Sequence, residues 1–150
     1  MSARAGGFGA REGAVYVEFL IAFLPVFTFF CCLLQLMLIY TADIVMRHAA
    51  WSAVRAAIVT FPDDPKVTAH PMADITSAAK YVCQAVPMIA QNSVVVSAND
   101  VGHAKAPVTA TVSARYVCPI MLANVIMCPE GFLNLRATAT MPNQGADYDY

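Results

Sequence analysis

The chain has little charge for its length. Asp, Glu, Lys and Arg make up 13% of its 150 residues, and the formal net charge is −1, whereas a soluble domain carries about 25% charged residues. The nine Lys and Arg residues are scattered singly, so no basic stripe or patch indicates nucleic-acid binding. The mean hydropathy of +0.58 instead indicates a concentrated apolar segment.

Motifs of catalytic and metal sites are also missing from the sequence. His48, His70 and His103 stand alone, without the close paired spacing of metal ligands. Asp63 and Asp64 lie between two prolines, and a turn explains them without acid–base chemistry. We find no phosphate-binding loop, dinucleotide fingerprint or catalytic Cys–His motif. The sequence therefore predicts a protein that is not an enzyme and that uses no metal or cofactor.

What is present is an uncharged apolar run from Phe19 to Tyr40. Its 22 residues are enough to cross a membrane, since about 20 apolar residues span about 30 Å of hydrocarbon. The alternative, a buried helix of a soluble protein, fits less well because the run is apolar on every face. Arg4, Arg11 and the amino terminus precede the run. The positive-inside tendency therefore predicts a cytoplasmic N-terminus and export of the residues beyond about 41.

The residues before the run do not match a secretory signal, which has a shorter apolar stretch and a small-residue cleavage site. They form a glycine-rich, basic leader of residues 1–13 that ends in Gly13, and Glu18 is the fifth residue after it. The stretch REGAVYVEFLIAFLPVF resembles the N-terminus of TadE-like pseudopilins, relatives of type IV pilins in tight-adherence (Flp) pilus systems. The matching residues are Gly13, Ala14, Val17, Glu18, Phe19 and Pro25.

The resemblance implies a structural minor pseudopilin in the bacterial inner membrane, incorporated at a surface pilus or initiating it. It implies cleavage by a prepilin peptidase between Gly13 and Ala14, and an assembly role for Glu18, Phe19 and Pro25. The expected partners are the lipid bilayer, other pilins and pseudopilins, the peptidase and the pilus assembly platform proteins. The alternative is an uncleaved single-pass anchor whose exported domain recruits another envelope protein.

Glu18 is unusual because it lies immediately before the uncharged apolar run. A carboxylate at a membrane helix centre costs about 2.5–3.5 kcal/mol, and less near the interface. Cleavage after Gly13 would create an ammonium at Ala14, which could meet the Glu18 carboxylate of a neighbouring subunit. Such a pair selects register, because a subunit out of register leaves a buried charge unmatched. The alternative is an acid that only favours the start of the helix.

We expect one helix over residues 14–60, membrane-spanning to about residue 40 and loosened near Pro25. Its exported half has large apolar residues at helical spacing, and we expect this stripe to pack against an exported domain. The turn Pro62–Pro65 should end the helix. The stripe consists of Ile44, Trp51, Val54, Ile58 and Phe61.

We expect residues 61–141 to form a small exported α+β domain and the tail 142–150 to be loose. Periodicity predicts a helix over Asp74–Val86, and the segment Pro119–Pro129 is either a short helix or a loop. β-branched and alternating residues predict an antiparallel sheet, which with the long helix gives a pilin-like layout. The three expected strands are Ser93–Ala98, Val108–Val117 and Phe132–Met141.

The five cysteines divide into two groups. Cys31 and Cys32 lie in the apolar run, where free cysteine behaves as a small hydrophobic residue. Cys83, Cys118 and Cys128 belong to the exported part, an oxidising compartment. Cys118 and Cys128 flank one apolar segment and are the first choice for a disulfide, and Cys83 with either of them is the rival pairing.

Overall fold

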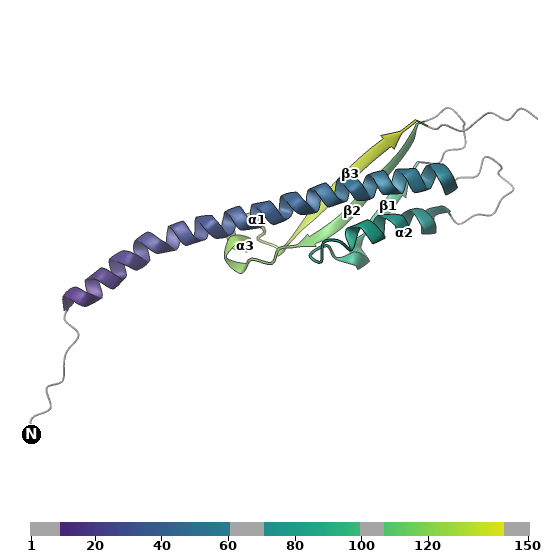
Figure 1. The fold of residues 1–150 in the computed structure, drawn as a ribbon. Coiled ribbons are helices and arrows are strands. Elements are labelled where there is room, and N and C mark those ends of the chain that lie inside the picture. The colour runs from purple at the N-terminus through teal and green to yellow at the C-terminus, as the bar shows by residue number, and fades with distance from the viewer. Residues whose placement is uncertain (1–9, 61–70, 100–106, 143–150) are drawn as a thin grey trace, which may run out of the picture.

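The structure is a computed structural model that describes residues 10–60, 71–99 and 107–142. Its fold is α+β, as predicted: a long N-terminal helix, two short helices and a three-stranded antiparallel sheet (Figure 1). In chain order the elements are α1 (Ala10–Thr60), α2 (Pro71–Cys83), the 3₁₀ turn η1 (Gln91–Ser93), β1 (Val95–Ala98), β2 (Val108–Val117), α3 (Met121–Met127) and β3 (Phe132–Met141).

Helix α1 has 51 residues, a length of about 75 Å at 1.5 Å per residue. It begins four residues before the predicted start, so the end of the leader is helical too. The helix continues through Pro25 and curves gently in its purple N-terminal part (Figure 1). In the described part of the chain, α1 is the one helix that is long and apolar enough to cross a membrane.

The sheet has the order β1-β2-β3. In the central strand, Val112 is opposite both Val96 and Ala137, and the alternation predicted for β2 and β3 is confirmed. The inner face of β2 is buried, whereas the outer face carries threonine pairs whose hydroxyls lie 3.0 Å apart, Thr109 with Thr140 and Thr111 with Thr138. The buried residues of β2 are Val108, Ala110, Val112, Ala114 and Tyr116.

The C-terminal half of α1 and the helix α2 cover the inner face of the sheet (Figure 1). The predicted stripe of large residues makes this contact only in part, through Val54 and the half-buried Ile58, which packs against the core. Ile44 and Trp51 are 51% and 46% exposed, Val54 alone is fully buried, and Phe61 lies outside the described residues. The contact face is mainly alanine: Ala42, Met46, Ala49, Ala50, Ala53, Val54 and Ala57.

The choice of an alanine-rich contact face on α1 has a steric cause. Alanine side chains let α2 and the strands approach the α1 backbone closely. Such an approach is favourable because protein interiors are densely packed. Ile44 and Trp51 are left on the flank of α1. Spacing alone found a helical stripe, but it did not decide which stripe is buried, because both are apolar.

Two further boundaries differ from the predicted ones. Helix α2 begins at Pro71 and ends at Cys83 instead of covering Asp74–Val86, since proline is well suited to the first helical position. Strand β1 begins at Val95 because the preceding residues form η1, where the Ser93 hydroxyl donates to the Ala90 carbonyl. The turn Pro62–Pro65, His70, His103 and the tail from residue 143 lie outside the described residues.

Candidate functional site

The part of α1 that precedes Cys31 packs against no other element among the residues that the structure describes. From Gly13 to Phe30 every side chain is exposed apart from the half-buried Thr28. The phenylalanines only stack along their own helix, with ring centroids 5.4 Å apart for Phe19 and Phe23. Exposed apolar surface on this scale marks contact with lipid or with other helices.

Glu18 lies on this exposed segment. Ala14, Glu18 and Ala22 follow one another at four-residue spacing and therefore share one face of α1. Among the described residues, the ion pair recorded is that of Arg47 with Asp43, at 3.0 Å, so the Glu18 carboxylate has no intrachain cation there.

Gly13 lies inside α1, where neither packing nor backbone conformation requires a glycine. A Cβ at this position would meet nothing within 4 Å, and glycine in a helix is about 1 kcal/mol less favourable than alanine. Gly131 is different, because its φ of +75° is strained for residues with a side chain. The fold explains Gly131 and leaves Gly13 unexplained.

Pro25 is also on the exposed segment and touches no part of the sheet domain. It removes one backbone hydrogen bond from α1. Nearby, the Thr28 hydroxyl donates to the Leu24 carbonyl at 2.8 Å. The structure therefore places the expected assembly residues Glu18, Phe19 and Pro25 on one exposed segment, and the expected cleavage position at the N-terminal side of it.

A second group of residues surrounds the disulfide. Cys118 and Cys128 are bonded, with an S–S distance of 2.02 Å, which confirms the favoured pairing over its rival. Cys83 is free and buried, with its Sγ 3.9 Å from the sulfur of Met46. Burial raises the pKa of the Cys83 thiol, so it reacts slowly with alkylating reagents while the domain is folded.

Non-reducing peptide mapping of the full chain should recover Cys118 linked to Cys128. Iodoacetamide should label Cys83 only after denaturation, because its thiol is buried in the native domain. The variant Cys83→Ser serves as the control and should keep the same linked peptide. A peptide that links Cys83 to either of the other two cysteines would contradict this assignment.

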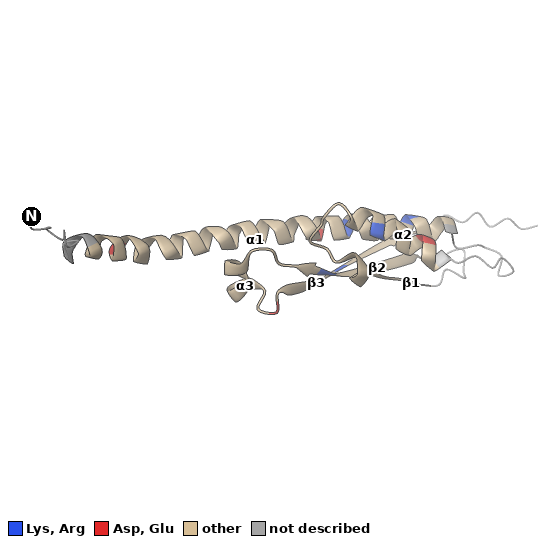
Figure 2. Cartoon of the chain, turned by 90° about the horizontal axis from the view of Figure 1, so that it is seen from below, with Lys and Arg blue, Asp and Glu red and all other residues tan. Residues whose placement is uncertain are grey.

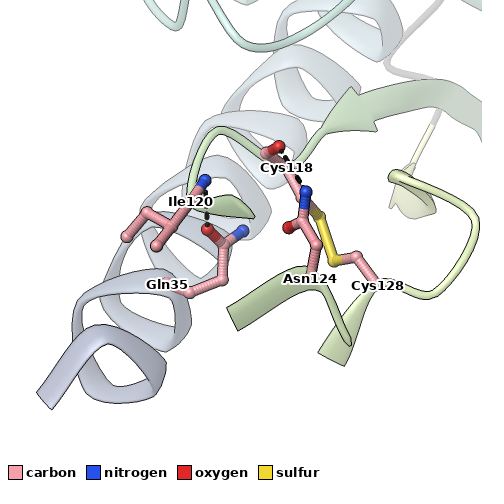
Figure 3. Close-up of a disulfide and its surroundings, with 5 residues drawn as sticks. All are labelled: Gln35, Cys118, Ile120, Asn124 and Cys128. Atoms are coloured by element: carbon pink, nitrogen blue, oxygen red, sulfur yellow. Dashed lines mark hydrogen bonds between the residues drawn. A yellow bond between two sulfur atoms is a disulfide. The ribbon is translucent and has the colours of Figure 1, made fainter. Parts of the chain in front are cut away.

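Close to the disulfide, Gln35 of α1 is fully buried. Its Oε1 accepts a hydrogen bond from the backbone N–H of Ile120 at 3.3 Å, and Asn124 Nδ2 donates to the Cys118 carbonyl at 3.1 Å. Figure 3 shows Gln35 pointing from α1 toward the segment that the disulfide closes. The bond to Gln35 attaches the loop around α3 to the apolar run of α1, and the bond from Asn124 lies within that loop.

Tyr116 of β2 is the largest fully buried side chain, and its hydroxyl lies beside Gln35. Burial raises the pKa of Tyr116, and the Gln35 side chain offsets part of this rise. Within the described residues, neither the Tyr116 hydroxyl nor Gln35 Nε2 makes a hydrogen bond of regular geometry. The two groups form a buried polar contact between α1 and the sheet.

The sequence analysis missed Gln35 and its loop contact. A signal was available, because Gln35 is the one amide side chain in the run Phe19–Tyr40. The structure does not bring this group together with Glu18, since 17 helical residues separate them, or about 25 Å. Comparisons of the chain with protein-family models, curated proteins and solved structures find no match.

Proposed function

We propose that the chain is a structural minor pseudopilin of a tight-adherence, type IV-like pilus apparatus. It is inserted in the bacterial inner membrane, processed after Gly13 and joined to other pilins through the N-terminal half of α1. The observation that carries this proposal is the exposed apolar segment of α1, which begins at a glycine that the fold does not require and holds one carboxylate without a cationic partner among the described residues.

The proposed assembly step uses charge in an apolar setting. Removal of residues 1–13 leaves an ammonium on Ala14, on the same helix face as Glu18. In a bundle of such helices, the ammonium of one subunit pairs with the Glu18 carboxylate of the next. Leaving either charge unpaired in that environment is strongly unfavourable, so the pair fixes the register of the subunits. The bilayer, other pilins, the prepilin peptidase and the platform proteins are the partners in this scheme.

The exported domain has features that suit the periplasmic side of the membrane. Its disulfide, Cys118 with Cys128, is of a kind that persists in oxidising compartments. Figure 2 shows most of the charged positions over the C-terminal part of α1, α2 and the sheet, whereas the sequence from residue 13 to 42 holds one charged residue, Glu18. This distribution supports a membrane-embedded first half and an aqueous second half of α1.

Replacing Gly13 tests the proposed processing. Gly13→Leu should abolish cleavage, because a bulky side chain before the scissile bond obstructs the peptidase. The fold itself should tolerate leucine, since the position is open and leucine is a better helix former than glycine. The measurement is the size of the membrane-bound protein on gels in a strain with an active prepilin peptidase.

Gly9→Leu is the matched control, with the same substitution four residues upstream in the leader, and it should be processed normally. Gly13→Leu protein that runs at the processed size would refute the cleavage site. If wild type and both variants all run uncleaved, the chain is better described as the single-pass anchor that recruits another envelope protein.

A further inference from the structure

Helix α3 presents an exposed apolar face. Met121 and Val125 are 87% and 78% exposed, and Leu122 and Ile126 beside them are exposed as well. The sequence has no charged residue between Val117 and Pro129, and α3 is entirely tan in Figure 2. Four exposed apolar side chains on two helical turns form a patch that is unfavourable in water.

The position of α3 along α1 suggests what covers this patch. Tyr16 and Tyr40, both exposed, stand near the two ends of the apolar run, about 36 Å apart along the helix. Tyrosines of membrane helices are enriched at the two membrane–water interfaces. Gln35, which holds the loop before α3, lies five residues before Tyr40, about 7–8 Å toward the membrane centre.

The polar groups of the loop are arranged for such a depth. A segment that enters hydrocarbon must satisfy its backbone groups within the protein. Gln35 accepts the Ile120 N–H, Asn124 donates to the Cys118 carbonyl, and the Cys118 N–H donates to Gly131 at 3.1 Å. The remaining amide atoms, Gln35 Nε2 and Asn124 Oδ1, have no hydrogen-bond partner among the described residues, but they are buried in the protein and would not face the acyl chains.

We propose that α3 is a membrane-interfacial element that inserts Met121, Leu122, Val125 and Ile126 between the acyl chains of the outer leaflet, beside α1. This inference rests on the membrane insertion and export that the proposed function assigns. Interfacial helices bury their apolar face about 5–10 Å below the headgroup boundary, which matches the level of Gln35. The exposed Glu130, in the turn that leads back to β3, remains with the headgroups.

Lipid is favoured over a protein partner because the α3 face continues the exposed apolar surface of α1 at the same level. Leu36 and Met37 there are also exposed. The subunit is then held in the membrane by two elements, α1 and α3, instead of by α1 alone. Because the disulfide closes the segment that carries α3, the contact of α3 with lipid fixes how the sheet is oriented about α1 relative to the membrane surface. It also opposes extraction of the subunit from the membrane.

Depth-dependent fluorescence quenching tests the proposal with the full chain in vesicles of phosphatidylcholine and phosphatidylglycerol. Trp51 is the single tryptophan, so each variant carries Trp51→Phe and one new tryptophan. Val125→Trp reports α3, Phe29→Trp reports the middle of the apolar run, and Tyr81→Trp on the exposed surface of α2 reports water. The lipids carry bromine either near the headgroup or near the end of the acyl chain.

Val125→Trp should have blue-shifted emission and be quenched most by bromine near the headgroup. Phe29→Trp should be quenched most by bromine near the chain end, and Tyr81→Trp by neither. Quenching of Phe29→Trp without quenching of Val125→Trp would overturn the inference alone. Blue-shifted but unquenched Val125→Trp would mean that a second protein copy covers α3, which also overturns it. An unquenched Phe29→Trp would instead refute the membrane insertion on which the proposed function depends.

Discussion

Glu18→Gln protein should insert into the membrane and be cleaved like wild type, yet fail to co-purify with other pilus components. A neutral amide lowers the cost of placing residue 18 near hydrocarbon, so insertion should not suffer. Glutamine and glutamate are similar in shape and helix propensity, so α1 is unchanged. What is lost is the counter-charge of the Ala14 ammonium, which leaves a charge unmatched in the assembled bundle.

Three measurements in one strain separate these steps: membrane fractionation, size after processing, and crosslinking to pilus components. Glu130→Gln is the matched control, since it removes an exposed acid of the exported domain and should behave as wild type throughout. Normal assembly of Glu18→Gln would show that the carboxylate only favours the start of the helix. Failure to insert would show that it acts before assembly.

The second large effect concerns the buried face of α1. Met46→Ala should destabilise the exported domain by about 2–5 kcal/mol, the range for truncation of a buried large side chain. Met46 is fully buried and contacts Cys83. Because small domains have only about 5–15 kcal/mol of total stability, the loss should be visible as a large drop in the thermal midpoint of the full chain in detergent.

Ile44→Ala is the matched control, two residues away on the same helix. Ile44 is about half exposed, so its truncation removes little buried surface and should cost about 1 kcal/mol or less. The stripe predicted from the sequence requires the opposite ranking. A larger loss for Ile44→Ala than for Met46→Ala would therefore contradict the face that the structure assigns to the core.

The strands were the most predictable part of this chain. In β2 and β3 the apolar and polar residues alternate, and a strand with one buried face needs that alternation, so both bounds agree with the sequence. The end of α1 at Thr60 agrees as well, because the proline-rich segment that follows cannot continue a helix. The disulfide was accessible to sequence reasoning because Cys118 and Cys128 enclose one short segment.

The contacts of α1 were less predictable. Its exported half is apolar on more than one face, and hydrophobicity ranks Trp51 above Ala53, whereas close packing against α2 and the sheet prefers the alanine. Gln35 was overlooked because it lies in the apolar run Phe19–Tyr40. The length of that run already indicated a membrane span, so its single amide was not considered separately. Its bond to Ile120 joins residues 85 positions apart, and such long-range pairs leave no local pattern in a sequence.

The mature N-terminus tests the central claim most directly. We expect intact-mass analysis and N-terminal sequencing of the protein purified from membranes to give a chain that begins at Ala14, lacking residues 1–13. This result would establish the ammonium that the assembly mechanism requires, one turn from Glu18. A chain that begins at Met1 or Ser2 in cells with an active prepilin peptidase would contradict the pseudopilin account and leave the single-pass anchor in its place.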